Sequence, residues 1–340
     1  MYEYERKVNN VYMCKGDLML TDLAKYLRDF EGVKRKSAIG PLVHSFYENT
    51  ENSNILASFG EDAAVIDNGC DLLLMAADGI WSKLMVSDPR WSGYCAVLVN
   101  IHDIAAMGGR PIAMVDVFSV SKKSTCTLVS AGISEAVRKF NVPIVGGHIH
   151  PDTPYSALDI AILGTVKRDC VIYSSTAEVG DDIIMAVDLD GMVHPSSELN
   201  WDSTSQKDPQ TLQKQIDSMR VLGESHLVNA GKDISNPGLI GTLGMLLEVS
   251  KKGAIVEVDK VPIPKDLNME NWLTIYPGMG FFVTARPENT EEIISIFEDH
   301  QLISARIGKI TDGSILSITD GSECASVFDF KDGCITGLEC

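Results

Sequence analysis

The chain is poor in positive charge. Its 340 residues include 29 lysines and arginines against 47 aspartates and glutamates, so its formal net charge is −18. Proteins that bind nucleic acid usually present a basic stripe to the phosphate backbone. We therefore expect no nucleic-acid partner. An acidic protein that binds phosphates usually does so through a divalent cation, helix N-termini and backbone amides.

Long hydrophobic runs and paired cysteines are missing as well. No apolar run approaches the ~18 residues that a membrane span needs, and the first residues lack the apolar core of a signal peptide. The eight cysteines form no Cys-x-x-Cys pair and fit no zinc spacing. These absences predict a cytoplasmic protein with reduced thiols and no membrane partner.

The common nucleotide and hydrolase signatures do not occur either. The sequence contains no Walker A motif, Rossmann glycine motif, Gly-x-Ser-x-Gly elbow or kinase signature. Its composition, with 45% apolar and 22% charged residues, is nevertheless that of an ordinary globular protein. Because single cores rarely grow beyond ~250–300 residues, we expect two domains.

The order of the predicted elements indicates a mixed α/β (α+β) fold. Residues 1–54 are predicted to form a peripheral helical extension, in which residues 18–30 carry the apolar spacing of one helix face. From residue 63 onward, strands alternate with helices. The turn-like segment 174–181 marks a boundary, so we predict one domain at 55–175 and another at 176–340.

Acidic residues gather between Gly60 and Pro111. Gly60 is followed by Glu61 and Asp62, and a predicted hairpin of residues 63–67 and 72–77, joined by Asn68-Gly69, ends at Asp78. Glycine allows a ligand to approach the backbone closely. Mg²⁺ prefers oxygen ligands, and Asp62 and Asp78 could share one ion. The alternative is that each acid is a turn residue or a helix cap.

A predicted helix at 91–107 contributes another acid. Asn100 and Asp103 are spaced i, i+3 and therefore lie on the same side of the helix. Their neighbours are mostly apolar, and a buried carboxylate must be paired, hydrogen-bonded or metal-bound. A buried hydrogen bond to a neighbouring loop is the alternative to a ligand site.

The segment Gly146-Gly147-His148 follows a predicted buried strand. Ligands of α/β folds bind at the carboxyl edge of the sheet, and His148 and His150 would face the same way. Histidine is a poor Mg²⁺ ligand, so a hydrogen-bonding role is favoured over coordination. Loop histidines satisfied by backbone groups remain the alternative.

The last candidate segment is Asp233-Ile234-Ser235-Asn236-Pro237-Gly238. Ser235 or Asn236 can cap the following helix, with Pro237 at its first position. The exposed amides of such an end suit a phosphate or a carboxylate. A helix cap without further function is the alternative.

The order of these motifs resembles the aminoimidazole ribonucleotide (AIR) synthase superfamily, which includes thiamine-monophosphate kinase and selenophosphate synthetase. The resemblance covers about residues 55–320 and is most specific in Asn100–Pro111. In detail the chain looks most like the AIR-synthase-related proteins of methanogens called methanogenesis marker protein 2. The resemblance implies an N-terminal sheet that forms a dimeric barrel with a second subunit, and a C-terminal α/β domain.

The resemblance also implies ATP, Mg²⁺ and a homodimer. It assigns metal binding to Glu61, Asp62, Asp78 and Asp103, and ATP binding to Gly60, Asp62, Asn100, Asp103, Gly146 and Gly147. His148, Asp233 and Asn236 are the catalytic candidates, with Ser235 facing the site beside them.

Two departures distinguish the chain from thiamine-monophosphate kinases. His148 and Asn236 stand where those enzymes carry aspartates, and their Gly-Glu-Asp-Tyr-Glu segment is replaced by residues 276–282. Selenophosphate synthetase shares the Gly-Gly-His motif. Of its reactive N-terminal loop, only Cys14-Lys15 has a counterpart in this sequence.

We therefore expect an ATP- and Mg²⁺-dependent phosphoryl-transfer enzyme that activates an oxygen of a small-molecule substrate. A thiamine-monophosphate kinase or selenophosphate-synthetase-like enzyme is one alternative. A non-catalytic ATP-binding subunit or sensor is another.

Overall fold

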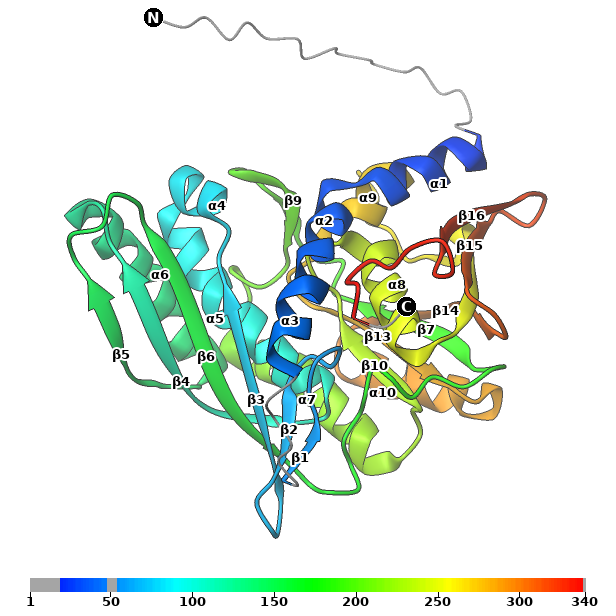
Figure 1. Ribbon diagram of the computed structural model, residues 1–340, viewed down its shortest axis with the longest axis horizontal. Helices are drawn as coiled ribbons and strands as arrows, with labels where there is room; N and C mark the ends of the chain where they lie inside the picture. Colours follow the sequence, from blue (N-terminus) through cyan, green and yellow to red (C-terminus); the bar gives the residue numbers. More distant parts are fainter. Residues whose placement is uncertain (1–18, 48–53, 339–340) are drawn as a thin grey trace, which may run out of the picture.

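The computed structural model describes residues 19–47 and 54–338. Cys14 and Lys15 lie outside the described residues. Two large sheets with their helices make up the molecule, which confirms the predicted mixed α/β class (Figure 1). The predicted domain limits at 55–175 and 176–340 stay a prediction.

The first half is built on a six-stranded sheet with the order β1-β2-β3-β6-β4-β5. Helices α5 (Pro89–Ala106) and α6 (Lys123–Phe140) lie together on one face of it (Figure 1). Its strands are β1 (Ile55–Ala57), β2 (Ala64–Asp67), β3 (Leu72–Gly79), β4 (Arg110–Ser119), β5 (Ile144–His150) and β6 (Ala157–Val166). The short helix α4 (Ser82–Ser87) precedes α5.

Two local signals position the site-bearing elements of this half. The β2–β3 hairpin forms as predicted, with Gly69 at a φ of 98° and its N–H donating to Asp67 Oδ1 at 2.8 Å. Helix α5 begins with Pro89 at its first position. The Asp88 side chain caps it by accepting from the Trp91 N–H at 2.9 Å.

The second half is built on a seven-stranded sheet with the order β10-β13-β7-β14-β11-β15-β16. Alternate residues of β7 (Asp182–Val187), an inner strand of this sheet, enter two cores. Ile184 and Ala186 pack in the core that includes α7 (Pro209–Ser225) and α10 (Thr290–Asp299), whereas Ile183 and Met185 pack with α8 (Gly238–Ser250). The strands are β7 (Asp182–Val187), β10 (Ala230–Asp233), β11 (Gly253–Glu257), β13 (Gly280–Ala285), β14 (Ile303–Thr311), β15 (Ile315–Thr319) and β16 (Cys324–Asp329).

A small third sheet contains strand β9 (Ser197–Asp202). It pairs with β8 (Met192–His194) and β12 (Tyr276–Pro277). Trp201 holds the sheet to the core, because it is buried and its Nε1–H donates to the Asp188 carbonyl at 2.9 Å.

The N-terminal helices pack on the second half of the molecule. They are α1 (Leu20–Asp29), α2 (Glu31–Lys34), the 3-10 turn η1 (Arg35–Ala38) and α3 (Ile39–Tyr47). The Arg28 guanidinium donates to the Val327 and Ser326 carbonyls at 2.6 and 2.7 Å, and α9 (Met269–Thr274) lies beside α1. The prediction of a helical segment is confirmed for the described residues.

Two further expectations concern membranes and thiols. Among the helices of the described residues, none is both long and apolar enough to cross a membrane. Cys334 is disulfide-bonded, so the expectation of fully reduced thiols is wrong at this residue. Cys70, Cys95, Cys126, Cys170 and Cys324 are free.

Candidate functional site

A cavity of about 530 Å³ lies between the two halves of the molecule. Four elements of the chain supply its polar wall: the segment before β2, the end of β3, the middle of α5, and the end of β10. The cavity brings together the side chains of Asp62, Asp78, Asp103, Lys232 and Asp233. Three of these carboxylates come from the first half and one from the second, so the two halves must dock to complete the site.

Asp62 is held by an ion pair that crosses between the halves. Its Oδ1 contacts the Lys232 ammonium, and both side chains are almost inaccessible to solvent, at 3% and 5%. Burial would lower the pKa of Lys232, yet the charges of Asp62 and Asp233 raise it above its ordinary value. Lys232 therefore remains a cation that offsets part of the carboxylate charge.

Burial and neighbouring charges raise the pKa values of both Asp103 and Asp233. Desolvation, reinforced by the charges of Asp233 and Asp78, holds the pKa of Asp103 well above its usual range. Burial and the charge of Asp62 raise the pKa of Asp233 to about 7, although Lys232 opposes this shift. Among the described residues, no donor forms a hydrogen bond to the Asp103 carboxylate. The site holds more carboxyl groups than ammonium groups.

Asp78 lies near the end of β3 and lines the cavity. Its Oδ1 accepts the Gly79 N–H at 2.9 Å. Desolvation by the cavity walls raises its pKa, and the Lys36 ammonium acts in the opposite direction. Lys36 comes from η1, so the expectation that the N-terminal segment is peripheral is wrong at this residue.

The donor set fits a hard divalent cation. Carboxylates of Asp62, Asp78, Asp103 and Asp233 line one cavity, and Asp103 has no protein donor among the described residues. Oxygen ligands of this kind suit Mg²⁺, which is usually held by one or two carboxylates together with phosphate oxygens and waters. A bound cation would also relieve the repulsion that raises the pKa values of Asp103 and Asp233.

Glu61 also lines the cavity, and its predicted role as a metal ligand stays a prediction. Its carboxylate accepts the Ser174 N–H, and it also accepts the N–H and the hydroxyl of Ser175 at 3.3 and 2.6 Å. Burial raises the pKa of Glu61, and these hydrogen bonds partly counter the shift. Glu61 thus ties the first half to the segment that leads into the second half.

Of the predicted nucleotide-binding residues Gly60 and Asn100, only Gly60 lines the cavity. Gly60 has a φ of 101° and packs so closely that a Cβ would lie 2.8 Å from Val249 Cγ1. Asn100 is fully buried and donates to the Ala96 carbonyl at 2.8 Å. Val99 and Asp103 face the cavity from α5, and the structure does not bring Asn100 to it.

The structure also does not bring Gly146, Gly147 and His148 to the cavity of their own chain. They lie in β5, an exposed edge strand and not the buried strand expected, three strand spacings from β3. At ~4.8 Å per spacing this is about 14 Å. The His148 and His150 rings do face the same way, with centroids 4.5 Å apart.

The helix cap predicted at Ser235 or Asn236 does not form. Pro237 is the N-cap of α8, and no side chain caps the helix; Gly238 follows with a φ of 77°. Ser235 instead donates its N–H to Thr242 Oγ1 at 3.2 Å. Ser235 and Asn236 both line the cavity beside Asp233.

Sequence reasoning missed the two lysines of the cavity. Lys232 precedes Asp233 within a strand whose four residues are all buried, and a lysine in such a strand requires a partner. That signal could have identified Lys232. Lys36 lies in a charged helical segment that carries no comparable local signal.

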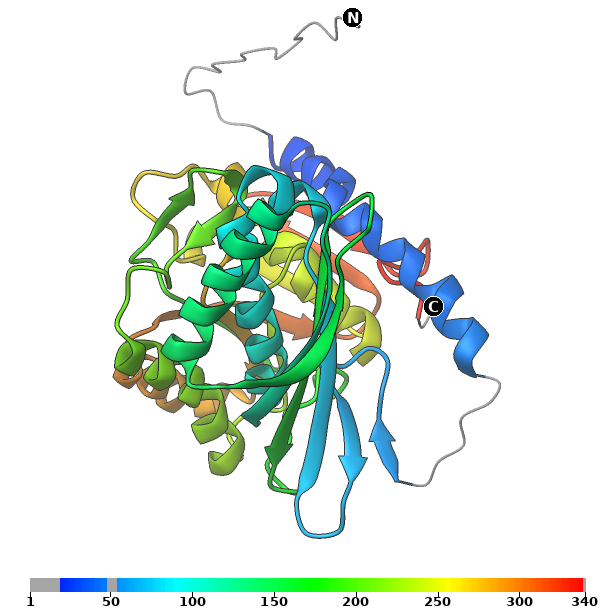
Figure 2. The same ribbon diagram turned by 90° about the vertical axis from the view of Figure 1, so that its left-hand side faces the viewer.

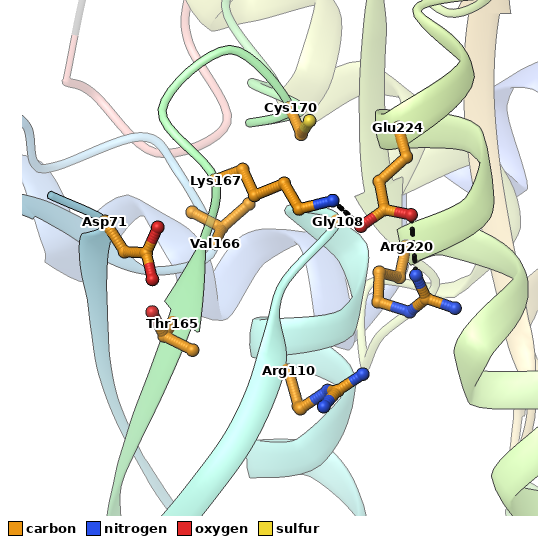
Figure 3. Close-up of a pocket in the computed structure, with 9 residues that line it drawn as sticks. All are labelled: Asp71, Gly108, Arg110, Thr165, Val166, Lys167, Cys170, Arg220 and Glu224. Carbon is orange, nitrogen blue, oxygen red and sulfur yellow. Dashed lines mark hydrogen bonds and ion pairs between the residues drawn. The ribbon is translucent and has the colours of Figure 1, made fainter.

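A second hollow, of about 440 Å³, lies on another part of the surface (Figure 3). Three cations line it, but two of them are already paired. Glu224 accepts from Lys167 and from Arg220 at 2.7 Å each, and Arg220 also binds Asp217 at 2.6 Å. Ion pairs within the protein thus satisfy two of the three cations of this hollow.

The fold and the cavity together define a two-domain α/β protein with an acidic, lysine-containing cavity between its halves. The chain belongs to the AIR synthase related protein family. Residues 60–166 match the family's N-terminal domain, and residues 178–321 match its C-terminal domain. The predicted superfamily is thereby confirmed.

A similar relative is an uncharacterized protein of Methanocaldococcus jannaschii. It is 46% identical over 323 residues, which cover 94% of this chain and 99% of the relative. The relative carries no assigned activity, so it does not identify the reaction.

Solved structures show the same fold. PurL of T. maritima, complexed with ATP, superposes with a TM-score of 0.69 at 19% identity over 84% of this chain and 47% of that chain. AaThiL, complexed with AMPPCP and TMP, gives a TM-score of 0.64 at 18% identity over 84% and 96%. The chain thus spans about half of the PurL chain and nearly all of the AaThiL chain.

Proposed function

We propose that the protein is an ATP- and Mg²⁺-dependent enzyme that transfers a phosphoryl group to an oxygen of a small metabolite. The observation that carries the proposal is the Asp103 carboxylate, which has no donor among the described residues and lies with four more carboxylates in one cavity. The family supports it, since PurL and AaThiL have been solved with ATP and AMPPCP.

Each residue of the cavity would have a role that follows from its position. Asp78, Asp103 and Asp233 would hold Mg²⁺, which neutralises phosphate charge when bound. Lys232 holds Asp62 in place across the junction of the halves through their ion pair. Phosphoryl transfer depends mainly on positioning and on charge stabilisation. Asn236 lies at the cavity wall and is suited to bind the acceptor by hydrogen bonds.

Two alternative functions can be tested against this proposal. A thiamine-monophosphate kinase or a selenophosphate-synthetase-like enzyme would release ADP or AMP with its own substrate. A nucleotide-binding subunit or sensor would bind MgATP without turnover. We expect ADP release from MgATP that depends on one compound of a coenzyme-precursor panel. Binding without turnover across the panel would favour the sensor.

Metal binding should depend on pH through Asp233. Its folded pKa of about 7 lies above the ordinary value, so below that pH the carboxyl holds a proton that Mg²⁺ must displace. We expect the rise in melting temperature caused by Mg²⁺ to be larger at about pH 8 than at about pH 6. The Asp233→Asn variant should show a small rise at both values. An equal rise at both values in the unmodified protein would contradict this assignment.

We also propose a homodimer formed through the outer face of the first sheet. Exposed apolar side chains of three neighbouring strands stand on this face: Met75, Val115, Val117 and Leu163. Contiguous exposed apolar patches of this kind mark interaction sites. Met75 also lines the cavity, so a second chain on this face would border it. His148 pairs in register with Val117 and would lie at the same interface.

The Val117→Glu variant should be monomeric, because a charge would then be buried in the proposed interface. Light scattering of the eluting protein measures the mass directly. Val86→Glu is the matched control, since Val86 is 84% exposed on α4, away from this face. A wild-type protein with the mass of one chain would contradict the dimer.

A further inference from the structure

Two segments outside the family's domains meet over the cavity. One is the N-terminal segment of residues 32–40 and the other is the tail of residues 335–338, whereas the matched domains cover 60–166 and 178–321. We call these two segments the clasp. Figure 2 shows the N-terminal helices running alongside the C-terminal end of the described chain. Lys36 and Ile39 line the cavity from one segment, and Thr336 and Leu338 from the other.

A buried carboxylate anchors the tail. Glu248 of α8 is 2% exposed and accepts the N–H groups of Ile335 and Gly337 at 2.8 and 3.1 Å. It also accepts the N–H and the hydroxyl of Thr336. A carboxylate that satisfies four donors fixes the path of an otherwise irregular segment.

The two segments then join by direct backbone contact. The Gly40 N–H donates to the Thr336 carbonyl at 2.8 Å. A Cβ at Gly40 would lie 2.4 Å from the Gly337 carbonyl oxygen, so the contact has no room for a side chain. Gly32 packs similarly tightly, since a Cβ there would lie 2.2 Å from the Asn236 carbonyl oxygen. The N-terminal segment is thus fixed on both sides of Lys36.

The Lys36 ammonium has no direct partner in the described part of the chain, where no residue accepts a hydrogen bond from it or forms an ion pair with it. The charges of Asp78, Asp233 and Asp103 act on it through the cavity, while desolvation lowers its pKa. A partly enclosed ammonium is stabilised by an anion that enters beside it.

We propose that the clasp positions Lys36 to bind the terminal phosphate of ATP. This inference rests on the proposed function and deepens it. Mg²⁺ and the triphosphate would occupy the carboxylates, and the Lys36 ammonium would reach the group that is transferred. Because MgADP lacks that group, Lys36 should contribute to discrimination between MgATP and MgADP.

Calorimetric titration of the full chain with MgATP and MgADP tests the inference. We expect Lys36→Gln to weaken MgATP binding by about 10–100-fold, the worth of a charge-assisted phosphate contact, and MgADP binding by less than about threefold. Lys34→Gln is the matched control, because Lys34 lies two residues away in an exposed ion pair with Asp29. It should behave like the wild type.

The clasp itself is tested by two further variants. Gly40→Val pushes the tail away, and Glu248→Gln removes its anchor; each should reduce the MgATP to MgADP affinity ratio as Lys36→Gln does. If both variants fail to fold, truncation after residue 334 makes the same test. An unchanged ratio in Lys36→Gln would overturn the inference and leave the proposed function intact. A wild-type protein that does not bind MgATP would instead overturn the proposed function.

Discussion

Asp78→Asn and Asp103→Asn should each weaken MgATP binding by at least about 100-fold, since even outer-shell partners of a metal site contribute about 10–100-fold. Both carboxylates line the cavity, and Asp103 has no protein donor among the described residues. Asparagine keeps the size of the side chain but removes the charge. The loss should therefore appear as a loss of Mg²⁺-dependent affinity in calorimetry.

Asp71→Asn provides the control for this pair. Asp71 is an exposed acid that precedes β3, in the same hairpin as Asp78, and it does not line the carboxylate cavity. Its variant should bind MgATP like the wild type. If Asp78→Asn and Asp103→Asn both retained wild-type affinity, the assignment of the cavity as the metal–triphosphate site would be wrong.

Lys232→Met should lower the free energy of unfolding by about 3–5 kcal/mol, the usual cost of leaving one member of a buried ion pair alone. The Lys232 and Asp62 side chains are 5% and 3% exposed. Removal of the ammonium would leave the Asp62 carboxylate buried beside Asp233. Urea denaturation of the metal-free protein measures the change.

A double variant distinguishes the effect of the unpaired charge on stability from the effect of lost packing. Asp62→Asn removes the stranded charge, so Lys232→Met combined with Asp62→Asn should recover much of the stability that Lys232→Met loses. Equal destabilisation in the single and double variants would mean that the lost packing of the lysine stem, and not the charge, is responsible.

Local patterns predicted the elements that carry the first-half acids. The Asn68-Gly69 turn fixes the β2–β3 hairpin, and the helix predicted at 91–107 is α5, which begins two residues earlier, at Pro89. Once those elements exist, Asp62, Asp78 and Asp103 reach one cavity. The family resemblance supplied the expectation that Asp233 joins them.

Contacts between distant parts of the chain could not be predicted in this way. Lys36 and Thr336 are 300 residues apart in sequence, and no periodicity links them. The helical phase of α5 is similarly uncertain from spacing alone, and it turns Asp103 toward the cavity while Asn100 packs in the core. An apolar strand next to glycines was expected to be buried, yet β5 is an edge strand with an exposed face.

A calorimetric titration of the wild-type chain with ATP, in Mg²⁺ and then in EDTA, tests the central claim most directly. The carboxylate cavity accounts for one site per chain. Its carboxyl groups outnumber its ammonium groups, so ATP should bind poorly there when no metal is present. We expect one ATP bound per chain in Mg²⁺ and no measurable binding in EDTA. Equal affinity in both solutions, or no binding in Mg²⁺, would contradict the account.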